Sequence, residues 1–292
     1  MRPAIIAALC LVLGLFGGCS ALRLGYSTAP SLVYWWLDRY VDFNGAQTVK
    51  AEAALAQWFR WHRRSELPDY AALLARAELE VTADTTGARV CEWQADLIKR
   101  AETAFDHAVP AAAEIVLTIT PEQITHIEGR YAKVNEEFAD DYLQADPSKR
   151  AAATLKRTVE RAEMLYGKLD TGQRASMGAA LARSPFDPAL WLSERQARQR
   201  DALELLRQLT QGKATREQAE AALRAYAERI ERSPSEAYRR YWERLSAFNC
   251  GFAATLHNGT SAAQRRHAVQ TLAGWEGDLR AIAAKADPVP VE

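Results

Sequence analysis

The chain has 292 residues, 37 basic and 37 acidic side chains, and 48% hydrophobic residues. This length fits one large or two modest domains, and 48% hydrophobic residues are enough to bury a substantial core. The balanced charge lacks the basic excess that nucleic-acid-binding domains carry, so we expect no nucleic-acid partner.

The N-terminal segment predicts a signal peptide over residues 1–18. Arg2 gives a positive start, and residues 4–16 are apolar apart from one glycine. That run is too short for a helix that spans a bilayer, which needs about 20 apolar residues. It ends in "FGGC", residues 16–19, which resembles the lipobox of bacterial lipoproteins with Phe where Leu, Val or Ile is usual.

The lipobox resemblance implies cleavage before Cys19, a diacylglycerol on its sulfur and an acyl chain such as palmitate on the new amino group. Three chains hold a protein on a membrane without a spanning helix, since each buried methylene contributes about 0.8 kcal/mol. By the sorting rule of such lipoproteins, Ser20 implies the outer membrane and its periplasmic face. Residues 19–30 are then a lipidated tether. The alternative is a buried cysteine near the end of a transmembrane segment.

Cys91 and Cys250 are predicted to form a disulfide. Cys10 leaves with the signal peptide and Cys19 is acylated, so these two are the only thiols left in an oxidising compartment. The bridge closes a loop of about 160 residues and contributes on the order of 4 to 5 kcal/mol in the chain-entropy model. It requires the two helices that carry the cysteines to touch. The alternative is two separate buried cysteines.

Periodicity predicts an all-α fold over residues 31–286, as an irregular multi-helix bundle or stacked helical hairpins, with a flexible tail at 287–292. Apolar residues recur three and four positions apart nearly throughout, while Gly and Pro appear mainly between the periodic stretches. Residues 115–120, "IVLTIT", are interpreted as a helix end rather than a strand. The predicted helices are 31–42, 45–64, 69–83, 89–109, 121–143, 148–169, 172–183, 188–211, 216–232, 235–257 and 262–285.

Five of these helix starts carry the same signal. An Asn, Asp, Thr or Ser accepts from an orphan backbone N–H while a Gln three positions later reaches back, which is a capping box. The pairs are Asn44 with Gln47, Thr120 with Gln123, Asp170 with Gln173, Thr215 with Gln218, and Ser261 with Gln264.

The aromatic stretch "LVYWWLDRYVDF", residues 32–43, is the first candidate interaction surface. It contains Trp35, Trp36, Asp38 and Asp42, and Trp side chains favour the headgroup level of membranes. An interfacial helix or an aromatic groove for a ligand are therefore two interpretations. We favour a third, in which this first helix docks on the bundle with Trp36 and Tyr40 inward. Paired carboxylates for acid–base catalysis are the least favoured.

The stretch "WFRWHRRSELPDY", residues 58–70, is the second candidate. Arg60, His62 and Arg63 lie among aromatic side chains, a combination that binds lipid phosphate or a sugar acid. The favoured alternative is an ordinary helix C-terminus, where cations complement the helix dipole before Pro68 interrupts the helix.

No cofactor, metal or catalytic residue is expected. The acidic run at residues 135–142 is interpreted as a solvated face rather than a cation site. The histidines show no H-E-x-x-H pattern, and the chain has no G-x-S-x-G elbow and no Gly-rich phosphate loop.

The motifs "YWWLDRYVDF", "RWHRRSELPDY" and "ITPEQ" together resemble a family of uncharacterised proteobacterial lipoproteins, which implies an all-helical fold without an assigned activity. Separately, "ITPEQI", residues 119–124, resembles the L-T-x-x-Q signature of small periplasmic chaperones of the Spy kind. That likeness implies a helical surface that holds unfolded proteins without ATP.

The expected function is that of a non-enzymatic outer-membrane lipoprotein that binds a protein or envelope component through a helical surface. An ATP-independent periplasmic chaperone and a cell-envelope hydrolase are the alternatives. A chaperone should expose a continuous apolar patch, whereas a hydrolase should have a cleft with perturbed ionisable groups.

Overall fold

The structure is a computed structural model that describes residues 21–212 and 214–285. The predicted signal peptide, Cys19 and the tail predicted at 287–292 lie outside these residues. Within the described ranges the chain is helical almost throughout and contains no strand, which confirms the all-α prediction. None of the helices in these ranges combines the length and the apolar content needed to cross a membrane.

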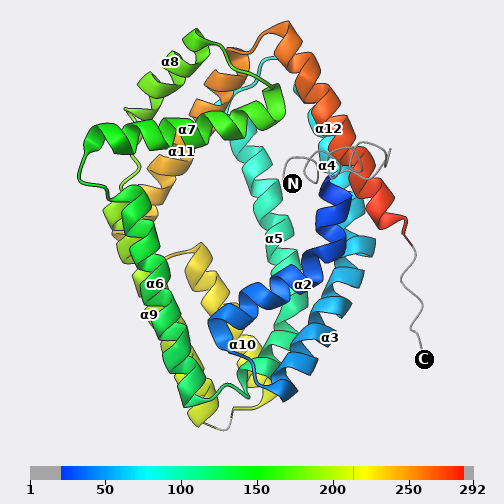
Figure 1. Cartoon of the computed structure of the whole chain (residues 1–292), viewed down its shortest axis with the longest axis vertical. Helices are drawn as coiled ribbons and strands as arrows, with labels where there is room; N and C mark the ends of the chain where they lie inside the picture. Colours follow the sequence, from blue (N-terminus) through cyan, green and yellow to red (C-terminus); the bar gives the residue numbers. More distant parts are fainter. Residues whose placement is uncertain (1–20, 213, 286–292) are drawn as a thin grey trace, which may run out of the picture.

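The helices form an irregular frame around α5 (Figure 1). α4 and α12 lie together along one side, α6 and α9 along the other, and α7 and α8 close one end. The elements are α2 (Ala21–Val41), α3 (Gly45–Trp61), the π-helical turn η1 (His62–Glu66), α4 (Leu67–Glu80), α5 (Gly87–Val116), α6 (Pro121–Tyr142), α7 (Pro147–Tyr166), α8 (Thr171–Leu181), α9 (Pro188–Gln211), α10 (Arg216–Glu231), α11 (Glu236–Asn258) and α12 (Ala262–Ala283).

Several small hydrophobic clusters, rather than one central core, hold this frame together. One cluster lies between α7, α8 and α12 and includes Val159, Met177 and Leu272. A second joins the end of α5 to α9 and α10 around Ala113 and Leu209. Because each apolar stripe meets a different neighbour, these buried residues fall into separate clusters rather than along one axis.

All five predicted capping boxes are present, each with both reciprocal hydrogen bonds. The glutamine side chains of two of these boxes, at the starts of α3 and α6, hydrogen-bond to each other in a back-to-back contact. The Gln47 side-chain amide donates to Gln123 Oε1 at 3.1 Å, and the Gln123 amide donates to Gln47 Oε1 at 2.7 Å. Gln173 and Gln264 repeat this arrangement at 2.8 and 2.9 Å. Each pair therefore starts two helices and fastens them together.

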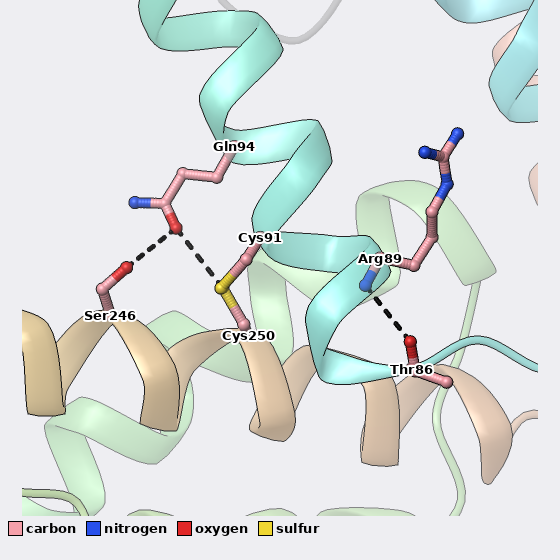
Figure 2. The surroundings of a disulfide bond; sticks show 6 residues. All are labelled: Thr86, Arg89, Cys91, Gln94, Ser246 and Cys250. Atoms are coloured by element: carbon pink, nitrogen blue, oxygen red, sulfur yellow. Dashed lines mark hydrogen bonds between the residues drawn. A yellow bond between two sulfur atoms is a disulfide. The ribbon is translucent and has the colours of Figure 1, made fainter.

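The predicted disulfide between Cys91 and Cys250 joins α5 to α11 (Figure 2), with a Cα–Cα distance of 5.5 Å. Beside it, Ser246 Oγ donates to Gln94 Oε1 at 3.1 Å. The two helices also approach closely one turn away, since a Cβ built on Gly87 would lie 3.2 Å from the backbone of Gly251. The bridge and this glycine contact fix the crossing of α5 over α11.

The first helix begins earlier than predicted. α2 starts at Ala21 rather than at residue 31, so most of the tether predicted at 19–30 is helix. Pro30, predicted to precede the helix, lies inside it and costs one hydrogen bond. Contacts upstream compensate, since Arg23 Nε pairs with Asp278 of α12 at 2.6 Å.

Two further proline positions do not break helices as expected. α5, predicted to end at residue 109, continues through Pro110 to Val116 because Val109 and Ala113 on either side are buried to 1% and 0% exposure. Packing of this kind outweighs a proline cost of about 3 kcal/mol. The chain also passes from α3 to α4 without a break, because the wide turn of η1 accommodates Pro68, which has no N–H to donate.

Candidate functional site

A groove of about 660 Å³ lies between α5, α9, α10 and α11. In Figure 1, α10 lies between α5 and the α6–α9 pair. The groove is lined by Ile98, Ala101, Glu102, Phe105, Asp106, Trp191, Arg198, Arg224, Ala227, Glu228, Ile230, Glu231, Ser233, Tyr238, Arg239 and Trp242. On α5 and on α10 the lining positions recur at three- and four-residue spacing, so each helix presents one face to the groove.

The groove has an apolar, aromatic wall that solvent reaches. Phe105 is 39% exposed and Trp242 is 36% exposed, values that are high for large apolar side chains in a folded interior. The Trp191 ring lies 5.9 Å from Trp242 and 6.5 Å from Tyr238. Burial raises the pKa of Tyr238, against the nearby Arg198 guanidinium, so this phenol stays protonated. The wall offers flat ring surface to a ligand.

The arginines of the groove already have partners. Arg198 Nε donates to Glu194 at 3.0 Å. Arg224 pairs with Glu220 at 3.3 Å and with Asp106 at 3.8 Å. Arg239 donates to the Ser233 carbonyl oxygen at 2.7 Å.

Three carboxylates of the groove differ from these arginines. Glu102, Glu228 and Glu231 form no ion pair with any residue that the structure describes. Arg198 and Arg224 pair with carboxylates, whereas Arg239 donates only to carbonyl oxygens and keeps its charge. Three glutamates without an ion pair against one such arginine leave negative charge next to the exposed rings. The groove is therefore complementary to a cation carried on an apolar stem.

Trp35 and Trp36, the aromatic pair predicted on the first helix, are both exposed, to 64% and 58%. The favoured interpretation is confirmed for the docking of the helix and for Tyr40, whose ring centroid lies 6.2 Å from that of Tyr131, but it is wrong for Trp36. The Trp36 ring covers the outer edge of the Tyr40 ring, with 4.9 Å between the two ring centroids.

Asp38 and Asp42 end the same helix rather than form an acid–base pair. Asp38 Oδ1 accepts the Phe43 backbone N–H at 2.9 Å. Asp42 takes a positive φ of 56° in the turn before α3. Asp tolerates this left-handed conformation better than most residues because its short side chain bonds locally.

The basic cluster predicted at Arg60, His62 and Arg63 is not a single surface. Arg60 is exposed and Arg63 is half-buried, whereas His62 lies inside an aromatic stack. The hydroxyl of Tyr26 is 3.0 Å from His62 Nδ1, and the Trp58 ring stacks on the imidazole at 4.7 Å. The ordinary helix C-terminus that we favoured here is also wrong, since η1 continues the helix.

Burial sets the ionisation of this stack. It lowers the pKa of His62 below its usual 6.5. It also raises the pKa of Tyr26 to about 12, with the Arg63 guanidinium opposing the shift. Both groups are therefore held neutral in the folded protein.

The lowered pKa of His62 predicts a loss of stability in acid. The unfolded chain binds a proton at this histidine near pH 6.5 while the folded chain does not, so stability present above pH 6.5 falls as the pH drops through the folded pKa. We expect His62→Phe, which keeps the stack, to weaken the dependence of the melting temperature on pH between about 7 and 5. Parallel curves for wild type and variant would contradict the assignment.

No metal site emerges from the described part of the chain, where no group of three or more His, Cys, Asp or Glu side chains is placed to hold an ion. The acidic run on α6 is a solvated face, with its members Glu136, Glu137, Asp140 and Asp141 all exposed.

Sequence reasoning missed the groove entirely. Its residues come from four helices and one loop between positions 98 and 242, and each helix taken alone has an ordinary amphipathic pattern. The sequence contained only a weak signal for the groove. Glu102 and Phe105 share one face of a periodic stretch, so that a charged side chain lies beside an aromatic ring on that face. Which helices face one another is decided by tertiary packing.

The described residues form an all-α protein with an open groove between the faces of four helices. The chain belongs to a family of unknown function, DUF6279, whose model matches residues 39–239. This confirms membership of an uncharacterised family, and the matched stretch contains all the groove residues except Trp242. No curated protein and no solved structure matches the chain.

Proposed function

We propose that the protein is a non-enzymatic lipoprotein, anchored through Cys19 in the outer membrane and facing the periplasm, that binds a partner polypeptide in the groove. The "FGGC" sequence at residues 16–19 supports the anchor. The bridge between Cys91 and Cys250 supports an oxidising compartment such as the periplasm.

The observation that carries the binding role is the imbalance of charge beside exposed rings. Glu102 and Glu228 face the groove from α5 and α10, with Phe105 one turn from Glu102. A Lys or Arg of the partner can pair with these carboxylates while its stem and neighbouring apolar side chains cover the rings. The volume of about 660 Å³ is in the range of sites that take a few side chains.

The partner segment is therefore a basic, amphipathic one, and its binding is expected to weaken with salt. A labelled amphipathic peptide of Lys and Leu, followed by fluorescence anisotropy, serves as the probe. Glu102→Lys combined with Glu228→Lys should weaken its binding by roughly tenfold or more, which corresponds to about 1.4 kcal/mol.

Asp140→Lys with Asp141→Lys is the matched control, because it reverses two exposed carboxylates on α6 outside the groove. The control should bind the peptide as the wild type does, and an acidic peptide of the same pattern should not bind. Equal loss of affinity in both double variants would rule out the groove as the site.

The anchor makes a separate prediction. Cells grown with radiolabelled palmitate should label the wild-type protein and not Cys19→Ala, because both acylation steps depend on the thiol. Wild-type protein that carries no label would remove the outer-membrane assignment and leave the groove unaffected.

A further inference from the structure

α2 has an inner and an outer face. The inner face packs on the protein: Tyr26 reaches His62, Tyr34 Oη lies 3.0 Å from Thr48 Oγ1, and Val41 joins the cluster of α6 and α9. These residues place α2 firmly between α12, α3 and α6, so its opposite face is fixed in orientation.

The outer face is apolar. Leu24, Leu32, Trp35 and Trp36 are 55%, 52%, 64% and 58% exposed. Their spacing of eight, three and one residues places them in one sector of the helix, about 120° wide at 100° per residue. Single exposed apolar residues need no explanation, but four large ones on one helix face mark an interaction surface.

The charge on α2 suits a membrane surface. Arg39 is exposed at the end of the outer face. Asp38 is the only acidic residue of the helix, and its carboxylate accepts the Phe43 backbone N–H. Tryptophan and arginine next to leucine are the side chains that place a helix at the headgroup level of a bilayer.

The position of α2 in the chain brings a bilayer within reach. Its first residue, Ala21, is two positions after Cys19, and two residues of chain span at most about 7 Å. An acyl chain on Cys19 would therefore hold the first turn next to the lipid headgroups.

We propose that the outer face of α2, defined by Leu24, Leu32, Trp35 and Trp36, lies in the headgroup region of a lipid bilayer. The contact adds a second membrane attachment to the lipid anchor and fixes how the domain sits on the membrane. It goes beyond the binding role of the groove, and it is a property of the helix face that does not require acylation.

The test uses residues 20–292, which contain every residue that the structure describes, with vesicles of phosphatidylethanolamine and phosphatidylglycerol. Because Cys91 and Cys250 are bridged, Leu32→Cys can carry a polarity-sensitive fluorophore. Its emission should shift to the blue on adding vesicles and be quenched by brominated lipid. The same label at Leu79→Cys, a position on α4 that is 77% exposed, should stay in water.

Trp35→Ala with Trp36→Ala should weaken vesicle binding by about tenfold or more, since two interfacial rings are lost. Trp242→Ala in the groove is the matched control and should bind vesicles like the wild type, and circular dichroism checks that each variant is folded. A label at position 32 that stays in water at saturating lipid would overturn the proposal. So would a dimer that forms without lipid and disappears in the double tryptophan variant, because the face would then bind a second copy. Groove binding, read with the Lys–Leu peptide, is independent of either result.

Discussion

Replacing Cys91 and Cys250 together with alanine is expected to lower the free energy of unfolding by on the order of 5 kcal/mol. The two residues are 159 positions apart, so the bridge removes a very large loop from the unfolded ensemble. It also holds α5 against α11, two of the four helices that line the groove.

Differential scanning calorimetry with and without reductant measures this effect. A loss of that size lowers the melting temperature of a protein this long by about 10 °C or more. The reduced wild type should behave like the double variant, which excludes an effect of the alanines themselves. If the bridge contributed nothing, the melting temperatures of the reduced wild type and the double variant would lie within a degree or two of that of the oxidised protein. The crossing of α5 and α11 would then not depend on the bridge for its stability.

Gln47→Ala is expected to cost about 3 to 5 kcal/mol, which is large for a polar residue. The side chain is 2% exposed and serves three partners. Its oxygen accepts the Asn44 N–H, and its amide donates to the Thr118 carbonyl oxygen at 2.9 Å as well as to Gln123. Removing it leaves buried polar groups of two helix starts without partners and opens a cavity.

Gln218→Ala is the matched control, because Gln218 closes the same kind of capping box at the start of α10 but is exposed. This substitution should cost about 1 kcal/mol or less, the usual value for a surface cap. Urea denaturation of both variants compares them directly. Equal losses would mean that the back-to-back contact with Gln123 adds nothing to the two caps.

Local chemistry made part of this structure predictable. A capping box involves residues within one turn, so all five could be recognised in the sequence, and the disulfide followed from counting the available thiols. The meeting of Gln47 with Gln123 could not be predicted, because it depends on how helices 76 residues apart are arranged.

Proline and tryptophan positions show which features could not be predicted from the local sequence. Pro30 and Pro110 carry strong helix-breaking signals, yet both lie inside helices because tertiary contacts on either side outweigh the local cost. Trp36 shares an aromatic helix with residues that do pack inward, and only the placement of α3 and α6 decides which rings remain outside. The groove could not be predicted either, because tertiary packing decides which helices face one another.

The two proposed contact surfaces are the apolar outer face of α2 and the acidic, aromatic groove between α5, α9, α10 and α11. The family match begins at residue 39, so it contains the groove almost completely and leaves most of α2 outside.

The most direct test of the binding role is photo-crosslinking in intact cells, with benzoylphenylalanine at Phe105 in the groove or at Leu79, an exposed residue of α4 that does not line the groove. The account predicts one polypeptide adduct in the membrane fraction from position 105, none from position 79, and loss of the adduct when Glu102→Lys and Glu228→Lys are introduced. The crosslinked peptide should be basic and amphipathic. An adduct that forms equally at both positions, or persists after the charge reversal, would contradict the groove as a binding site.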